Sequence, residues 1–452
     1  MRRIRLPVTK LAAFRYPTAL LMVTLFFGSG CVKYREQPLS ARTEAAKFRS
    51  RTLADVASQA GHHGGAWNEE VLVRAALLLH PDMELARAQL RTAQAGIETA
   101  AARPNPTLGF NGQVTGNMLA GMAPWSLGFT LDFPIETAGK RTHRIAQATH
   151  LSQAAALQYA TAAWQVRSRV RKNALDLYSA MARGELLRRE QQTQEQTLKA
   201  LDERVAAGEI ARPDLIQSRL LYNQSQLLLR DSERLQAESR AGLADAVGIP
   251  ARALDGVALD LQDFSRSPGN VAVERLRTRA LLSRSDVLEA LAEYAASEAA
   301  LRLEVARQYP DFHFNPGYLW DQGQHKWFIA PTVELPIFDR HHGPIAEAEG
   351  KRAQAAAKFR GVQMKASGDL DRAAAGYRGA LKKLETAETL LASQEKQKHS
   401  AETLLQSGET DRLALLSAAV ELDAIALSRL DALIEAQAAL GALEDAAQTS
   451  VK

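Results

Sequence analysis

The 452-residue sequence predicts a mainly α-helical fold with a small β part, in which one unit is repeated. Three observations lead to this prediction. Several short segments recur in the same order about 200 residues further along, long stretches lack Pro and contain little Gly, and each copy holds only two short alternating stretches. Each copy therefore consists of a helix, two strands and a long helical hairpin.

The recurring segments define the organisation of the chain. Residues 103–110 return at 307–314, 131–135 at 333–337, 144–148 at 344–348, and 208–209 at 408–409. The predicted boundaries are a signal peptide at 1–30, an N-terminal lipid-anchored or equatorial segment at 31–68, a first repeat at 69–247, an equatorial connector at 248–272, a second repeat at 273–447 and a tail at 448–452.

The N-terminal 30 residues have the features of a secretory signal. A basic start precedes an apolar run at 18–27, which is too short to span a membrane well. The run leads to Gly28-Ser-Gly-Cys31, and Cys31 is the only cysteine, so an internal disulfide is excluded. Small residues before a lone cysteine are typical of a bacterial lipoprotein, whose acyl chains Cys31 would carry. The alternative is an ordinary signal peptide with an incidental cysteine.

The charge balance and the motifs exclude several functions. Five of the 56 Lys and Arg residues lie in the first 30 positions, which contain no acid, so 51 basic residues remain against 51 acidic ones. A neutral chain does not favour nucleic acid as a partner. The sequence has no P-loop, no G-x-S-x-G and no His-Glu-x-x-His, so we expect no catalytic residue, no cofactor and no enzyme activity. The adjacent pairs His62-His63 and His341-His342 lack spaced partner ligands, so we expect no metal site.

The strand-like stretches have one apolar face and one small or polar face. The apolar positions are Leu127, Phe129, Leu131 and Phe133 in the first copy, and Trp327, Ile329, Val333 and Leu335 in the second. This pattern fits a half-buried sheet in water or membrane strands with these side chains toward lipid. Because the rest of the chain is helical and lipid cannot satisfy open strand edges, we expect the sheet to close with strands of other chains. Four strands per chain would give eight from two chains or 12 from three, and the residues do not choose between them.

The helical stretches are exceptionally long. The first extends from about Thr137 to Val205, close to 100 Å at about 1.5 Å per residue. It turns at Gly208 and returns from Pro213. The second hairpin runs from about 345 to 407, turns at Gly408 and returns from Asp411. Sevenfold spacing in the returning helices predicts left-handed coiled-coil packing. The spaced residues are Leu221, Leu228 and Leu235, and then Leu413, Val420, Leu427 and Ile434.

The chain resembles the TolC-like outer membrane factors, or outer membrane efflux proteins, over roughly residues 69–447. The motifs that carry the resemblance are Leu335-Pro-Ile-Phe-Asp-Arg340 with Gly343-Pro-Ile345, and Arg204-Val-Ala-Ala-Gly208 followed by Asp214. Within the family, Glu136-Thr-Ala-Gly-Lys-Arg141 is similar to the heavy-metal branch of CzcC- and CusC-like ducts. The resemblance implies a homotrimer, in which long hairpins form an α-barrel continued by a 12-stranded transmembrane β-barrel with four strands per chain.

The resemblance also implies a function. The chain would be the outer-membrane channel of a tripartite RND-type efflux pump, a passive exit duct that carries heavy-metal cations from the periplasm to the exterior. Its partners would be a periplasmic adaptor (membrane fusion) protein, an inner-membrane RND pump and outer-membrane lipid. The alternatives are a drug or small-molecule duct of the same fold, a periplasmic adaptor, and a lipid-anchored coiled-coil scaffold without a pore.

By resemblance, the two hairpin turns form the periplasmic tip that contacts the adaptor and closes the duct. The residues expected there are Arg204, Gly208, Asp214, Gly408, Glu409 and Asp411. Acids that ring the entrance in well-known members correspond here to Ala414 and Ser417, so either the nearby Glu409 and Asp411 substitute for them or the gate is steric. We expect salt bridges between the hairpins, with Asp214 or Asp411 as the acid, to hold the tip shut. The alternative is that both acids are solvated turn residues.

Overall fold

The computed structural model describes residues 32–116 and 123–451. The predictions of a signal peptide and of a lipid-bearing Cys31 concern residues outside these ranges. The chain divides into two units, residues 1–50 and 51–452, and each is described by itself. In the first unit the described part holds one helix, α2 (Ala41–Ser50), which buries no residue.

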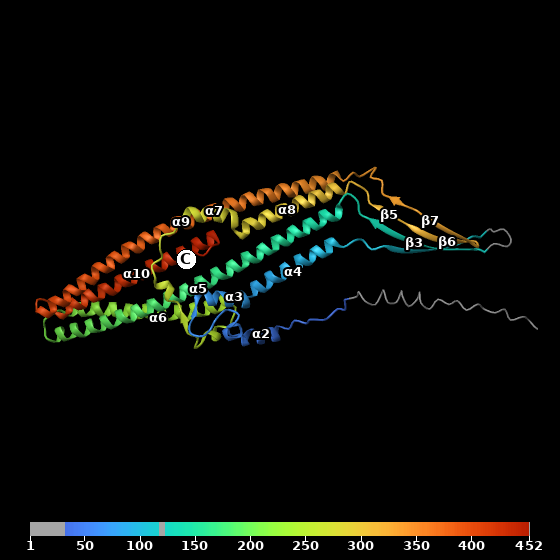
Figure 1. Cartoon of the computed structure of the whole chain (residues 1–452). Coiled ribbons are helices and arrows are strands. Elements are labelled where there is room, and N and C mark those ends of the chain that lie inside the picture. Colours follow the sequence, from blue (N-terminus) through green and yellow to red (C-terminus); the bar gives the residue numbers. More distant parts are fainter. Residues whose placement is uncertain (1–31, 117–122, 452) are drawn as a thin grey trace, which may run out of the picture. The chain divides into compact units, whose positions relative to one another are not determined.

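The second unit contains the repeat (Figure 1). Its helices are α3 (Glu69–Leu79), α4 (Pro81–Ala101), α5 (Lys140–Ala206), α6 (Arg212–Val247), α7 (Val273–Ser283), α8 (Ser285–Ala306), α9 (His342–Ser407) and α10 (Arg412–Ala447). Its strands are β1 (Trp67–Asn68), β2 (Thr107–Val114), β3 (Trp125–Ile135), β4 (Leu259–Asp260), β5 (Phe312–Phe314), β6 (Pro316–Asp321), β7 (Gln324–Ile329) and β8 (Thr332–Val333). Short 3-10 turns lie at Leu53–Val56, Ala251–Leu254 and Gln262–Ser265.

The two long hairpins are α5–α6 and α9–α10. Helix α5 has 67 residues and α9 has 66, so each is about 100 Å long. On the strand side α5 packs against α4 and α8, and on the turn side it packs against α6 and α10. The sheet of β2, β3 and β5 to β8 lies at one end of the unit and both hairpin turns lie at the other (Figure 1). This arrangement confirms the predicted duplicated hairpins.

Six strands form one antiparallel sheet with four positions across it, which are called lines below: β2, β3, β5 with β6, and β7 with β8. Strand β2 pairs with β3, and β3 pairs on its other side with both β5 and β6. Strand β5 in turn pairs with β8, and β6 pairs with β7. The register does not change along any line, so β5 and β6 are two parts of one strand, as are β7 and β8. The turn between β6 and β7 is two residues, Gln322 (φ 52°) and Gly323 (φ 93°), as a tight hairpin requires. The outer edges of β2 and of the β7–β8 line have no strand partner among the described residues.

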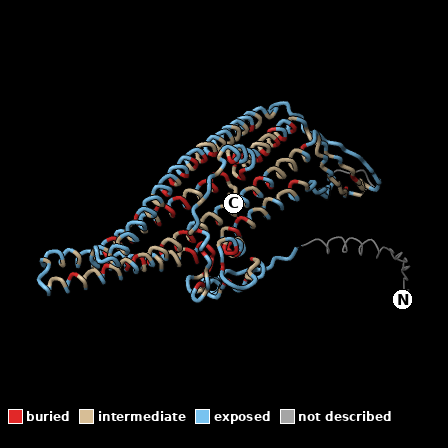
Figure 2. The backbone as a smooth tube through the Cα atoms, turned by 60° about the vertical axis from the view of Figure 1, so that its left-hand side comes forward, coloured by how far each residue is buried: buried red, intermediate tan, exposed pale blue. Residues whose placement is uncertain are grey.

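The most continuous core lies near the middle of the unit, where α3, α5 and α6 meet. Leu72, Val166, Val170 and Leu243 are fully buried there. The parallel pair β1–β4 joins the segment before the first repeat to the connector, with Trp67 opposite Leu259. Along the hairpins, scattered buried positions alternate with exposed and half-buried ones (Figure 2).

The leucines that recur every seven residues in α6 do not pack within their own hairpin. Leu221, Leu228 and Leu235 are all exposed in the single chain, and Leu228 is 54% exposed. The buried positions in the middle of α6 are instead Ser225, Leu229 and Ser232. The sevenfold row therefore lies on a face of α6 that its own chain leaves uncovered.

Candidate channel wall and hairpin tip

The two faces of the sheet differ in chemistry. Because the register is continuous, Phe129, Tyr318 and Trp327 lie side by side on one face, and their rings are in contact. Most of the side chains at the predicted apolar positions are exposed in the single chain, and Trp327 is 77% exposed. Leu127, Phe133, Ile329, Val333 and Leu335 are also exposed, whereas Phe129 and Leu131 are half-buried. Leu335 lies just beyond the end of β8.

The opposite face carries a network of polar side chains that the sequence analysis did not identify. Asp321 on β6 accepts hydrogen bonds from Ser126 Oγ on β3 (2.5 Å) and Lys326 Nζ on β7 (2.6 Å). Further along, His313 Nδ1 lies 2.9 Å from Asp132 Oδ1. These pairs join residues up to 195 positions apart, so only the strand register could have found them. The sheet thus has a polar face and an apolar face.

At the other end of the unit, one ion pair joins the two hairpin turns. Arg204 Nη1 donates to Asp411 Oδ2 (2.8 Å), and Arg204 Nε donates to Glu209 Oε2 (3.0 Å). Asp411 also caps α10 by accepting from the Ala414 backbone N–H (2.9 Å). The Ala414 N–H and Arg204 together hold the pKa of the Asp411 carboxyl below its usual range.

The other predicted tip residues lie at the same turns. Gly208 (φ 74°) and Gly408 (φ 76°) adopt the left-handed conformation that ends each long helix. Asp214 lies in the first turn of α6, and within the described ranges neither its carboxylate nor that of Glu409 has an ion-pair partner. Of the two acids considered for a bridge between the hairpins, the structure therefore pairs Asp411 and not Asp214.

A row of pairs continues the contact between the hairpins along α5 and α10. Arg189 Nε donates to Asp423 Oδ1 (2.8 Å), and Arg167 Nη2 donates to Glu444 Oε2 (2.9 Å). The acids are deeply buried, since Asp423 is 4% exposed and Glu444 is 3% exposed. In these pairs the bases come from α5 and the acids from α10. The pairing residues are more than 200 positions apart, so periodicity within one helix gave no signal for it.

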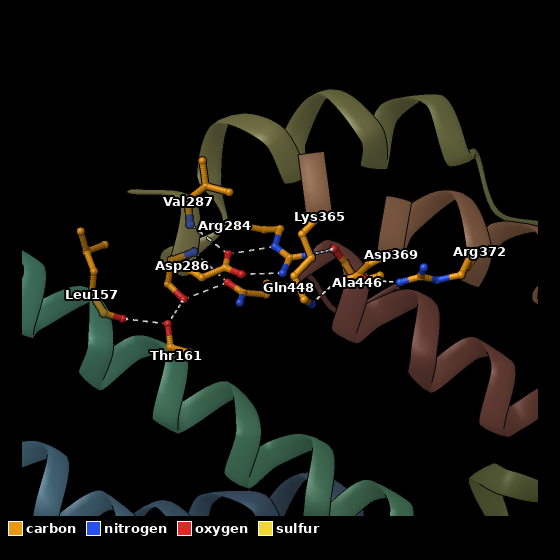
Figure 3. Close-up of polar contacts among 11 residues, drawn as sticks. Leu157, Thr161, Arg284, Asp286, Val287, Lys365, Asp369, Arg372, Ala446 and Gln448 are labelled. Atoms are coloured by element: carbon orange, nitrogen blue, oxygen red, sulfur yellow. Dashed lines mark hydrogen bonds and ion pairs between the residues drawn. The ribbon is translucent and has the colours of Figure 1, made fainter. Parts of the chain in front are cut away.

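Each repeat also has a bend between its two shorter helices, and the bends use different chemistry. In the second repeat, Arg284 holds both carboxylate oxygens of Asp286 (2.9 and 2.6 Å) and donates to the Ala446 carbonyl (2.7 Å), as Figure 3 shows. Gln448 Oε1 accepts from the Ser285 N–H (2.7 Å) and so caps α8. These bonds fix the end of α10 against the start of α8.

In the first repeat, His80 takes the place of Arg284 at the α3–α4 bend. His80 Nε2 lies 2.9 Å from Arg169 Nη1, and Arg169 also pairs with Asp82 (2.9 Å). Burial lowers the pKa of His80. Gly248, with φ 87°, ends α6 directly against this bend. Both bends therefore join the strand side of a repeat to its hairpin.

The described residues were compared with the requirements of a metal centre and of a membrane-spanning helix. No group of three or more His, Cys, Asp or Glu side chains is placed to hold a metal ion in the part of the chain that the structure describes. Of the predicted His pairs, His62 stacks on Trp67 (4.2 Å between ring centres) and His341 Nε2 lies 3.0 Å from Glu304 Oε2. Within residues 32–116 and 123–451, no helix combines the length and apolar character needed to cross a membrane.

A comparison with protein families gives the identity of the fold. A model described as outer membrane efflux protein matches residues 72–249 and 276–447, two stretches that correspond to the two repeats. The chain belongs to the outer membrane efflux protein family. Membership confirms the resemblance stated from the motifs.

Individual relatives of this family differ considerably in sequence. The cobalt-zinc-cadmium resistance protein CzcC of Cupriavidus metallidurans is 26% identical over 220 residues, which is 48% of this chain and 52% of that protein. The chain thus matches about half the length of this curated relative. Its likeness to solved structures covers far more of the chain.

Three solved structures have this fold. CusC is 19% identical with a TM-score of 0.68, over 84% of this chain and 92% of that one. VceC of Vibrio cholerae is 19% identical with a TM-score of 0.68, over 87% and 96%. The outer-membrane channel OprN is 17% identical with a TM-score of 0.68, over 93% and 98%. The predicted fold class, mainly α with a small β part and duplicated long hairpins, is confirmed.

Proposed function

We propose that the chain forms a passive efflux duct in the outer membrane, as one subunit of a homotrimer. The observation that carries the proposal is the four-line sheet with one outward apolar face, one polar face and two unpaired edges. A membrane strand needs lipid outside and satisfied backbone groups on both sides, so such a sheet must close with copies of itself. Three copies supply 12 strands, and the polar face with Asp321 and Asp132 then lines the lumen.

The exposed leucines support the same assembly on the helical side. Leu221 and Leu228 are uncovered on α6, and α6 and α9 are the outer helices of the hairpin layer, since α5 and α10 pack between them. Closing the ring would bring α6 of one subunit beside α9 of the next, where the sevenfold row would be buried. The unpaired strand edges and the uncovered outer helices would thus both be covered by an adjacent subunit.

Reconstitution tests the duct directly. The purified full chain is added to planar lipid bilayers, and current steps are recorded as single channels insert. The duct reading predicts discrete, long-lived conductance steps together with heat-modifiable migration on gels. A lipid-anchored scaffold without a pore would give neither, and an adaptor would give no conductance steps.

The ion pair between Arg204 and Asp411 at the hairpin turns is proposed as part of the gate. Arg204 and Asp411 hold the two turns of one subunit together, so their separation would allow the hairpins to move apart. Asp411→Asn removes the charge while asparagine keeps the cap on α10. We expect this variant to raise the open-channel current or open probability, whereas Asp214→Asn leaves both unchanged. Identical current traces from Asp411→Asn and the unaltered protein at all voltages would rule out a role for this ion pair in the gate.

The proposed partners and cargo follow from the relatives. We propose that the tip, with Gly208, Gly408 and Glu409, contacts a periplasmic adaptor driven by an inner-membrane RND pump, and that heavy-metal cations pass through the duct. The support is the similarity to a protein named for cobalt, zinc and cadmium resistance. A deletion strain should become sensitive to zinc, cobalt, cadmium or copper. Sensitivity to antibiotics alone would favour the drug-efflux duct instead.

Acylation of Cys31 is proposed as the anchor, and mass spectrometry of the N-terminal peptide tests it.

A further inference from the structure

A basic cavity lies beside the bend between α3 and α4, away from both the strands and the tip. It has a volume of about 510 Å³ and is lined by Arg51, Arg87 and Arg91, with Glu84 as the single acid and Leu78 and Leu79 as apolar wall. Three positive charges against one negative charge leave the cavity positive. Nothing in the duct or gate accounts for it.

The guanidinium groups in this cavity are available to a ligand. Within the described part of the chain, Arg87 and Arg91 have no hydrogen-bond or ion-pair partner, although Arg87 is half-buried. Arg51 is fixed differently, because its Nη1 donates to the Leu79 carbonyl (3.1 Å) and the Gly248 carbonyl (3.5 Å). Arginine carries five N–H donors, so Arg51 keeps donors free while its position is held. Such forks match the two oxygens of a carboxylate or phosphate.

The second repeat shows that helix packing does not require these arginines. The bend residues His80 and Arg284 are equivalent and 204 positions apart, and α4 and α8 each begin one residue later. At the same offset, Arg87 corresponds to Leu291 and Arg91 to Ala295. The repeat thus folds its second copy without either charge, so a role outside the fold explains them better.

The position of the cavity decides between two sources of anions. Arg91 and Arg87 lie about 15 and 21 Å along α4 from its end at Ala101, before β2 begins. The polar headgroup region of a bilayer is only about 5–7 Å deep on each side. Since the proposed function places β2 in the membrane, the cavity lies in the periplasm beyond the reach of lipid phosphates. Its volume also exceeds what a single inorganic anion needs and fits a short peptide.

We propose that this cavity binds a short anionic peptide of the cell wall, of the stem-peptide type that peptidoglycan carries. The peptide's carboxylates would pair with Arg51, Arg87 and Arg91, its amino group with Glu84, and its aliphatic side chains would contact Leu78 and Leu79. The contact would hold the duct at the peptidoglycan layer, a role additional to conduction.

Co-sedimentation with purified peptidoglycan sacculi tests the proposal, with the full-length protein in detergent. The test variant is Arg87→Gln/Arg91→Gln. The matched control is Arg230→Gln/Arg234→Gln, two arginines at the same helical spacing on α6. We expect the unaltered protein and the control to sediment with sacculi in a salt-sensitive manner, and the test variant to bind at least about tenfold more weakly. Soluble stem tripeptide should compete with the sacculi.

Two further readouts keep the outcomes distinct. Arg91→Gln alone, which alters an exposed side chain, should still lower sacculus binding several-fold, so a folding defect cannot explain the loss. Equal sedimentation of the test variant and the unaltered protein would overturn the proposal. So would loss of binding to vesicles of anionic phospholipid with sacculus binding intact, because the site would then be a lipid site. All variants should conduct normally in bilayers, so a missing pore would contradict the duct and not this site.

Discussion

Gly248 offers a sharp test of how the hairpin joins the strand side of the first repeat. It ends α6 with φ 87°, and a Cβ at this position would lie 2.9 Å from His80 Cα and 3.0 Å from the Leu79 carbonyl oxygen. Alanine would therefore meet backbone atoms, which cannot swing aside as a flexible side chain can. Gly256 has a similar φ of 72° but open space around its Cα, so Gly256→Ala is the matched control.

The magnitude follows from two separate costs. The left-handed conformation costs a non-glycine residue about 1–2 kcal/mol, and both variants incur it. The close contact at Gly248 adds about 1–3 kcal/mol, as overpacking of a tight site usually does. Gly248→Ala should thus lose about 2–5 kcal/mol of unfolding free energy, against about 1–2 kcal/mol for Gly256→Ala.

Denaturant unfolding followed by far-ultraviolet circular dichroism measures the difference. Both variants are purified in the same detergent and unfolded in guanidinium chloride, and their midpoints are compared at equal slope. The expected result is a clearly lower midpoint for Gly248→Ala. Equal midpoints for the two variants would refute the close approach of α6 to the α3–α4 bend.

Three other predictions concern the contacts within and between hairpins. Arg284→Ala should lower the unfolding free energy by about 2–4 kcal/mol in the same assay, because Asp286 and the Ala446 carbonyl lose their donor; a loss no larger than that of Arg266→Ala, an exposed site, would contradict this. Burial raises the pKa of the Asp445 carboxyl above its ordinary value of 3.8, so its stabilising contribution is complete below that pH and is lost as the pH rises through the raised pKa. Stability of the unaltered protein relative to Asp445→Asn should therefore fall over this range, and a difference independent of pH would refute the assignment. Leu228→Asp should abolish the trimer in cross-linking experiments while the helical signal persists, whereas Leu229→Asp, at a position 9% exposed, should reduce the helical signal itself; the reverse pattern would contradict the proposed helix edge.

The local features were predictable because short-range physics sets them. Alternation at Leu127 and Phe129 gave the strands, and the Pro- and Gly-poor stretches gave α5 and α9 to within a few residues. Gly208 and Gly408 gave the turns because a left-handed residue is needed to end a helix there. The duplication was visible because equivalent residues recur at a nearly constant offset.

The long-range contacts were not predictable in the same way. The pairing of Ser126 with Asp321 depends on strand register, and that of Arg189 with Asp423 depends on which helices become neighbours. The sevenfold row of α6 predicts a packing stripe, but a single sequence does not state which helix covers it. Leu228 is uncovered by its own chain, so the row carries information about assembly.

Covalent closure of the sheet edges between subunits tests the proposed barrel most directly. Gly109→Cys on β2 is combined in turn with Lys326→Cys or Phe328→Cys on β7 and with Thr332→Cys on β8, and outer membranes are oxidised before denaturing gel analysis. A barrel shared by three subunits should give covalent dimers and trimers and nothing larger in at least one combination, with no such bands from the unaltered chain. Dimers as the largest species would indicate an eight-stranded closure, and monomers in every combination would contradict a shared barrel.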